Sequence, residues 1–162
     1  MASKGVSDKP YRKGVGIVLL NSSGEVFIAQ RCDRKEPAWQ MPQGGMHEGE
    51  DPLVAALREL EEEIGTANAE FIAESEGWLH YDFPPEIQSN VWKGRYRGQK
   101  QKWFLMRFSG HDKEVNLNTR NPEFSDWKWT TLQNLPNLIV GFKKNLYRQV
   151  IEAFARLVKP EG

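Results

Sequence analysis

The stretch GGMHEGEDPLVAALRELEEEIGT, residues 44–66, decides the fold of this chain more than any other part. It starts as a loop of small residues and reaches Asp51-Pro52, a capping carboxylate followed by a proline at the first helical position. Apolar side chains at positions 53, 56, 57, 60 and 64 then recur at the spacing of one buried helical stripe. The pattern predicts a helix that runs to about Ile64 and is ended by Gly65 in the left-handed conformation.

Three carboxylates share a second face of this predicted helix. Glu59, Glu62 and Glu63 stand at i, i+3 and i+4, so their side chains lie close together. Like charges at this spacing repel one another, and Arg58 offsets only part of the repulsion. Ligands that are all oxygen atoms suit a hard divalent ion, Mg²⁺ or Mn²⁺. The alternative interpretation is a solvated acidic face, the usual role of a charge run.

The wider pattern favours the metal site. Gly44, five residues, Glu50, seven residues and then Arg-Glu-aliphatic-x-Glu-Glu-x-Gly follow in register. This arrangement resembles the Nudix box, Gly-x5-Glu-x7-Arg-Glu-U-x-Glu-Glu-x-Gly-U, where U is aliphatic. Thr66 is the one departure and falls on a packing position. The resemblance implies an α/β class protein with an α/β/α sandwich around a mixed sheet. The matching residues are Gly44, Glu50, Arg58, Glu59, Leu60, Glu62, Glu63 and Gly65.

Length and composition indicate one domain. The chain has 162 residues and a single cysteine, Cys32, so it cannot form an intrachain disulfide. We expect a flexible N-terminus over residues 1–10, a single domain over 11–158 and a C-terminal tail over 159–162. No apolar run approaches the length of a membrane span. We expect a cytoplasmic protein that is a monomer and has neither a membrane nor DNA as a partner.

Charge is unevenly distributed although the formal net charge is zero. Residues 48–63 hold seven acids and one base, which leaves 15 acids against 21 bases elsewhere. An acidic metal site in a mildly basic surround suits a polyphosphate, which metal ions and cationic side chains can hold together.

The remaining elements follow from periodicity and turn residues. A hairpin of strands is expected over 14–20 and 25–31, and a loop or partly ordered insertion over 86–99. A closing amphipathic helix is expected over 139–158. Further strands are expected over 69–75, 76–83, 102–109 and 124–130. The closing helix would turn toward the core Phe142, Leu146, Val150, Ala153, Phe154 and Leu157.

The resemblance extends over most of the chain and narrows to one branch of the Nudix family. That branch contains bacterial RNA pyrophosphohydrolases, which remove pyrophosphate from 5′-triphosphorylated RNA, and asymmetrical diadenosine tetraphosphate hydrolases, which split dinucleoside polyphosphates. The motifs that carry it are Tyr11-Arg12-x-Gly14-Val15-Gly16, residues 39–45 (WQMPQGG), residues 98–104 (GQKQKWF) and Pro122-Glu123-Phe124.

The resemblance also implies roles for the acidic residues. Two or more Mg²⁺ (or Mn²⁺) ions would be held by Glu59, Glu62 and Glu63, with Glu123 as a further ligand or base and the Gly44 carbonyl completing one shell. Glu59 is the expected general base, with Glu62 and Glu123 as alternatives. Glu50 and Arg58 are expected to support the site without touching substrate.

Substrate contacts must come from cations and aromatic rings. Phe142 and Tyr81 are candidate stacking residues, although Phe142 fits the core of the closing helix equally well. The resemblance to RNA-acting members places Arg12, Arg31, Phe142 and Lys143 along the path of the first nucleotides. The candidates for phosphate contacts are Arg12, Arg31, Lys100, Lys102, Lys143 and Lys144.

Three functions compete at this point. The first is a metal-dependent RNA 5′ pyrophosphohydrolase that also cleaves dinucleoside polyphosphates. The second is an enzyme whose main substrate is the dinucleoside polyphosphate. The third is a catalytically inactive Nudix domain that only binds nucleotides, which the intact glutamates argue against. The sequence does not decide between the first two.

Overall fold

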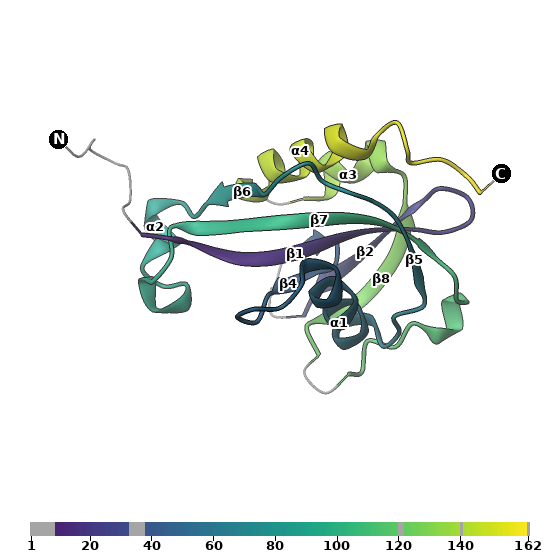
Figure 1. Ribbon diagram of the computed structural model, residues 1–162, viewed down its shortest axis with the longest axis horizontal. Helices are drawn as coiled ribbons and strands as arrows, with labels where there is room; N and C mark the ends of the chain where they lie inside the picture. The colour runs from purple at the N-terminus through teal and green to yellow at the C-terminus, as the bar shows by residue number, and fades with distance from the viewer. Residues whose placement is uncertain (1–8, 33–37, 120–121, 140, 162) are drawn as a thin grey trace.

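The computed structural model describes residues 9–32, 38–119, 122–139 and 141–161, with the backbone alone at Phe142. Within these residues a mixed eight-stranded sheet organises the chain (Figure 1). Its strands are β1 (Tyr11–Leu20), β2 (Val26–Arg31), β3 (Trp39–Gln40), β4 (Gln43–Gly45), β5 (Ala69–Glu74), β6 (Leu79–Asp82), β7 (Gly98–Phe108) and β8 (Phe124–Thr130).

Two long parallel strands form the middle of the sheet. β1 and β7 pair from Tyr11 opposite Gly98 to Leu20 opposite Arg107. The other pairings are antiparallel: the order is β3-β2-β1-β7-β5, with β8 on β2, β6 on β7 and β4 on β1. β2 and β3 therefore lie on one side of β1, and β6 and β7 lie on the other.

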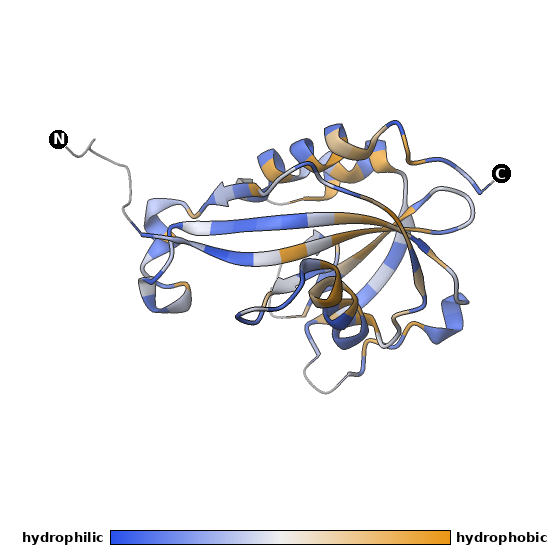
Figure 2. Ribbon diagram, in the orientation of Figure 1, coloured by the Kyte–Doolittle hydropathy of each residue, from blue (hydrophilic) through white to orange (hydrophobic). Residues whose placement is uncertain are grey.

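Helices cover both faces of the sheet (Figure 1). Helix α1 (Pro52–Ile64) packs on one face, where its buried residues meet alternate side chains of β1 such as Val15 and Ile17. Helices α3 (Leu135–Leu138) and α4 (Lys144–Phe154) cover the other face. Hydrophobic residues gather where the strands meet the helices, while the far ends of β1 and β7 are hydrophilic (Figure 2). The predicted α/β/α sandwich with a mixed sheet is confirmed.

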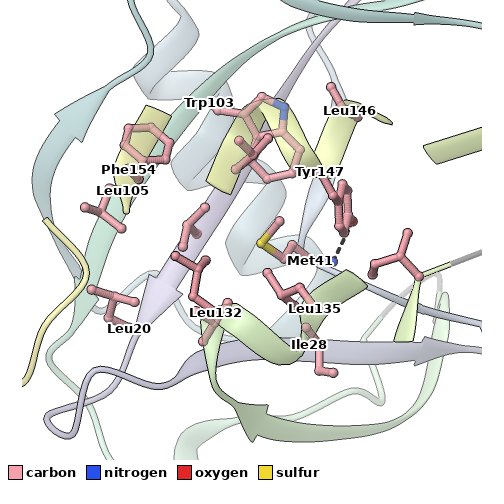
Figure 3. Packing of buried hydrophobic residues seen from close by; sticks show 14 of the residues in the cluster. Leu20, Ile28, Met41, Trp103, Leu105, Leu132, Leu135, Leu146, Tyr147 and Phe154 are labelled. Atoms are coloured by element: carbon pink, nitrogen blue, oxygen red, sulfur yellow. Dashed lines mark hydrogen bonds between the residues drawn. The ribbon is translucent and has the colours of Figure 1, made fainter. Parts of the chain in front are cut away.

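A hydrogen bond joins helix α4 to the segment that leads into the decisive loop. The Tyr147 hydroxyl accepts from the Met41 backbone N–H at 2.8 Å, and the Tyr147 ring lies edge-on to Trp103 at 5.8 Å (Figure 3). Complete burial raises the pKa of Tyr147 far above its ordinary value. The helix thus fixes the chain two residues before β4.

Helix α1 has the predicted ends. The Asp51 carboxylate accepts from the backbone N–H groups of Leu53 and Val54, and Pro52 occupies the first turn. Gly65 ends the helix with φ of 83°, a conformation that favours glycine.

The start of β7 and the C-terminal region differ from the prediction. Residues 86–99, expected as a loop or partly ordered insertion, hold most of α2 (Pro85–Gln88), the 3₁₀ turn η1 (Trp92–Gly94) and the first residues of β7, which starts four residues before the predicted strand. The closing helix is shorter than predicted, because the 3₁₀ turn η4 (Gly141–Lys143) precedes α4 and the helix ends at Phe154. Leu157 lies beyond this helix end and is exposed, and Ala153, within the helix, is exposed as well, so neither is buried in the core as predicted.

Short segments complete the chain. The 3₁₀ turns η2 (Asp112–Glu114) and η3 (Leu132–Asn134) connect strands and helices. The last described residues pack on the β1–β2 turn, where the Glu161 N–H donates to the Ser22 carbonyl at 2.8 Å. In the described segments, no helix combines the length and apolarity needed to cross a membrane. The flexible N-terminus stays a prediction, because residues 1–8 lie outside the described part.

Candidate active site

A cleft of about 1460 Å³ brings the predicted acidic residues together with cationic side chains. Helix α1 contributes its carboxylates from one side, and Glu123 comes from the segment that enters β8. Residues 50 and more positions apart in the chain thus meet at one site. The predicted site residues that line the cleft are Arg12, Arg31, Gly44, Arg58, Glu59, Glu62, Glu63, Tyr81, Glu123 and Lys143.

Arg58 organises the entrance to helix α1. Its guanidinium donates two hydrogen bonds of 2.9 Å to the Glu50 carboxylate and a third to the Gly45 carbonyl. It also contacts Glu59 at 2.9 Å and Glu62 at 3.3 Å. The Arg58 hydrogen bonds are the largest cause of a Glu50 pKa of about 2, and a bond from the His47 N–H adds to them. Arg58 and Glu50 therefore close the loop onto the helix.

Glu63 has the opposite surroundings. Only 5% of the residue is exposed, and no cationic side chain is among the groups that shift its pKa. Burial raises its pKa well above the ordinary value, and the nearby Glu123 and Glu59 carboxylates raise it further. The Gln43 N–H, which donates to Glu63 at 3.3 Å, opposes this only in part. Burial and the neighbouring acids thus disfavour the charged form of Glu63, so a bound cation would stabilise its carboxylate.

Glu59 lies between these two environments. One of its oxygens accepts from Arg58, while the other lies against the backbone of Gly44, where a Cβ would overlap the carboxylate. Burial raises its pKa, Arg58 lowers it, and Glu62 and Glu123 raise it again. Glycine at position 44 is thus required by the close approach of the Glu59 side chain.

The segment that carries Glu123 is fastened to the end of β2. The Cys32 N–H donates to the Glu123 carbonyl at 2.9 Å, and the Cys32 thiol contacts the Pro122 carbonyl at 3.6 Å. This backbone contact brings the Glu123 side chain within hydrogen-bonding reach of Glu63.

The donor set fits a hard divalent cation. In the described ranges no three acidic, His or Cys side chains already form a metal-holding group, and Arg58 contacts two of the carboxylates, Glu59 and Glu62. A cation would nevertheless stabilise the buried Glu63, which lies beside Glu59 and Glu123. The nearby Gln43 Oε1 is a buried acceptor that has no hydrogen-bond partner in the described part of the chain. All of these donors are oxygen atoms, as Mg²⁺ and Mn²⁺ prefer.

Comparison with known proteins agrees with this geometry. A family model described as "NUDIX domain" matches residues 10–150. The chain belongs to the Nudix family. An RNA pyrophosphohydrolase of Rhodospirillum rubrum is 53% identical over 94% of this chain and 92% of its own length. A second RNA pyrophosphohydrolase, from Roseobacter denitrificans, is 52% identical over 95% of this chain and 98% of its own.

Solved structures confirm the fold. An Ap4A hydrolase of C. elegans, in a binary complex, superposes with a TM-score of 0.64 over 90% of this chain and 99% of its own, at 23% identity. The predictions of a Nudix hydrolase, and of similarity to RNA pyrophosphohydrolases, are confirmed by these matches. Nudix hydrolases generally use divalent metal ions, in line with the donor set.

The predicted substrate residues of this Nudix domain divide into two groups. Arg12, Arg31, Tyr81 and Lys143 line the cleft. The Tyr81 hydroxyl is buried and accepts from Gln99 Nε2 at 2.6 Å, and burial raises its pKa to about 12. It therefore forms part of the cleft wall.

The second group does not reach the described cleft. Lys102 points away from it and pairs with Glu74 at 3.6 Å, because alternate side chains of β7 face opposite sides of the sheet. Lys100 lies on that same far side, over the ring of Trp78. Lys144 is exposed at the start of α4. The side chain of Phe142 lies outside the described residues.

Sequence reasoning missed several lining residues of the Nudix cleft. Gln43 and Gln99 lie within motifs that the resemblance used, so their buried polar side chains were open to prediction. Trp92 falls in the region expected to be a loop, where no periodicity points to a role. The missed lining residues are Gln40, Gln43, Gly45, Glu61, Phe83, Ile87, Val91, Trp92, Gln99 and Thr119.

Proposed function

We propose that this Nudix hydrolase removes pyrophosphate from 5′-triphosphorylated RNA in a metal-dependent reaction. The observation that carries the proposal is a carboxylate cluster at a cleft edged by Arg12, Arg31 and Lys143, made of the buried Glu63, the partly buried Glu59 and the exposed Glu123. The carboxylates can bind metal ions, and the neighbouring cationic side chains can bind phosphate oxygens. Together they suit a phosphate chain that is bound along with metal ions. Full-length relatives named RNA pyrophosphohydrolase support the RNA substrate.

The metal ligands in this proposal are Glu59, Glu62, Glu63 and Glu123, with the Gly44 carbonyl. Two or more Mg²⁺ (or Mn²⁺) ions would supply charge neutralisation and activation of water when bound. Glu62 lines the cleft, its side chain is 58% exposed, and its contact with Arg58 is 3.3 Å long, so its carboxylate is accessible to a metal ion. Glu50 and Arg58 keep the loop in place and take no part in proton transfer.

The reaction breaks the phosphoanhydride bond between the α- and β-phosphates. A water oxygen becomes bonded to phosphorus, pyrophosphate leaves, and the proton passes to a carboxylate. We assign the acceptor to Glu59, whose second oxygen lies beside Gly44 and is not bonded to Arg58. Arg12, Arg31 and Lys143 neutralise the phosphate oxygens and orient the first nucleotides, in a protein that we expect to be a cytoplasmic monomer.

Hydrolysis of dinucleoside polyphosphates is the second candidate function. The same phosphoanhydride chemistry would serve it, and the fold neighbour titled Ap4A hydrolase shares the architecture. The cleft volume also exceeds the roughly 300–1,000 Å³ of a typical small-ligand site, which leaves room for a nucleoside at each end.

A paired assay tests the proposal. Turnover of a 5′-triphosphorylated RNA oligomer and of diadenosine tetraphosphate is measured with Mg²⁺, with Glu62→Gln as the blank. We expect faster pyrophosphate release from RNA, abolished by the substitution and by EDTA. Preference for the dinucleotide would move the function to the second candidate. Absence of turnover of both substrates would refute the enzymatic proposal.

A further inference from the structure

The cleft has an apolar side that the phosphoanhydride chemistry does not use. We call it the aromatic bank: Phe83, Ile87, Val91 and Trp92, which lie between β6 and the start of β7. The catalytic carboxylates come from α1 and from the entry to β8, so the bank is a separate part of the cleft. Apolar and aromatic side chains in a polar cleft suit the flat face of a base.

The backbone presents Trp92 in an unusual conformation. Trp92 and Lys93 have φ of 47° and 56°, and Gly94 follows with φ of 70°. Left-handed conformations at bulky residues cost free energy and persist where the surrounding structure enforces them, often at ligand-binding positions. The ring packs against Phe83 at 5.4 Å and Tyr96 at 6.0 Å, yet 37% of the residue stays exposed. The fold thus holds a large apolar ring at the cleft surface.

Arg12 connects the aromatic bank to the site of chemistry. Its guanidinium lies 4.4 Å from the centre of the Trp92 ring. It also lies against Gly45, where a Cβ would overlap it, and the Gly45 carbonyl is the one held by Arg58. A cation therefore stands between an aromatic ring and the carboxylate group, the order in which a nucleotide presents its base and its phosphate.

The cationic residues on the other side of the cleft lie across β1. Arg31 is on β2, Gln40 is on β3, and the Lys143 ammonium is 3.4 Å from the Gln40 side-chain oxygen. β2 and β3 flank β1 on one side, whereas the aromatic bank adjoins β6 and β7 on the other. The cleft therefore has room for one nucleoside beside the aromatic bank and for another beside Arg31 and Lys143, with the phosphates between them.

We propose that the aromatic bank is a second nucleobase subsite, in which Trp92 stacks on the distal nucleoside of a dinucleoside polyphosphate and Arg12 contacts the adjoining phosphates. This inference rests on the proposed function, in which Arg12, Arg31 and Lys143 contact the phosphates and the first nucleotides. Of these three residues, Arg31 and Lys143 lie on the side opposite the aromatic bank, and Arg12 lies against it. A triphosphorylated RNA carries nucleosides at one end of its phosphates only. A dinucleoside polyphosphate carries them at both ends, so it occupies both the aromatic bank and the side of Arg31 and Lys143.

Substrate-dependent kinetics test the subsite. KM and kcat are measured with Mg²⁺ for diadenosine tetraphosphate and for a 5′-triphosphorylated RNA oligomer, using wild type, Trp92→Ala and Trp92→Phe. We expect Trp92→Ala to raise KM for the dinucleotide about tenfold, the size of one lost base–aromatic stack, with far less change for RNA. Trp92→Phe keeps a ring and should retain most of the affinity.

Trp78→Ala is the matched control. Trp78 is a partly buried tryptophan on the far side of β7, within 6 Å of Lys13 and Lys100, and is not among the described residues that line the cleft. Its substitution should leave the ratio of the two KM values as in wild type. Retained RNA turnover by Trp92→Ala also shows that the variant is folded.

Several results would overturn the subsite. Equal increases in KM for both substrates would mean that Trp92 acts through Arg12 rather than on a base. An unchanged dinucleotide KM, or no binding of diadenosine tetraphosphate to wild type by calorimetry, would also reject it. Failure of wild type to hydrolyse RNA, with a dinucleotide KM still raised by Trp92→Ala, would instead refute the proposed function and support the subsite.

Discussion

Two neighbouring parts of the Nudix box, the surroundings of Arg58 and those of Glu63, differ in how the charges of their carboxylates are balanced. Around Arg58, one guanidinium satisfies the Glu50 carboxylate, the Gly45 carbonyl and an oxygen of Glu59. Around Glu63, which is buried, the neighbouring acids Glu59 and Glu123 raise its pKa, and no cation is among the groups that shift it. In the first part, opposite charges and hydrogen bonds hold the loop shape. In the second part, the charged form of Glu63 is unfavourable until a cation binds. These carboxylates therefore lower the stability of the metal-free fold in return for a metal site.

Removal of Glu63 is expected to have the largest effect. Glu63→Gln keeps the shape but removes a central negative ligand, so activity should fall about 10²- to 10³-fold. The same substitution removes a buried, repelled charge, so the metal-free protein at neutral pH should be as stable as wild type or more stable. Turnover and thermal unfolding of one preparation measure both. Glu152→Gln, an exposed residue on α4, is the control; a parallel loss of activity and stability would contradict the contrast.

Arg58 should behave in the reverse manner. Arg58→Met leaves Glu50 and the Gly45 carbonyl without their donor, and because the arginine is partly exposed we expect destabilisation of about 2 kcal/mol. Urea unfolding measures the change. Arg97→Met is a matched comparison, since Arg97 is equally exposed, at 22% against 23%, but its carboxylate ion pair is with Asp82 outside the box. Similar losses in the two variants would show that the Arg58 network has no special role.

Mg²⁺ should stabilise the acidic part selectively. At a concentration tenfold above the dissociation constant, binding to the folded state alone adds about 1.4 kcal/mol, a rise in Tm of about 3–6 °C for a domain of this size. The increment should vanish in Glu63→Gln and persist in Trp78→Ala. Thermal scans with Mg²⁺ and with EDTA give the measurement. An increment that survives in Glu63→Gln would place the ion elsewhere.

The smallest expected effect concerns pH and Glu50. Hydrogen bonds from Arg58 lower the pKa of Glu50 to about 2 from an ordinary value of 4.5. A depressed carboxyl pKa stabilises the fold above the ordinary value, and this stabilisation is lost as pH falls from 4.5 toward 2. Wild type should exceed Glu50→Gln in urea midpoint at pH 7, and the gap should close in acid. Glu76→Gln, in the β5–β6 connection, should show no such closing gap.

Much of the fold could be predicted because its signals are local. The cap at Asp51, the stripe of helix α1 and the terminal Gly65 depend on a few adjacent residues, and the structure has them as expected. The C-terminal helix was predicted too long because apolar residues after Phe154 continue its periodicity, although the chain there turns back to Ser22. A contact that distant leaves no trace in local spacing.

The candidate site shows the same limit. The glutamates of helix α1 and the cations Arg12 and Arg31 follow from motif and resemblance, and the structure gathers them at one cleft. Lys102 does not join them, because strand alternation turns it to the far face, and which face of a strand meets a cleft depends on elements far away in the sequence. Trp92 escaped prediction because its position depends on an irregular left-handed turn.

The contact between Cys32 and the Glu123 segment offers a practical handle. Cys32 is the only cysteine in the chain and is exposed, and its backbone is bonded to that of Glu123. A thiol-reactive fluorophore or spin label therefore attaches at one position without any background substitution. Such a probe sits next to Glu123, the acidic residue that, among the described residues lining the cleft, comes from outside helix α1. Its signal reports directly on how that residue responds to metal and substrate.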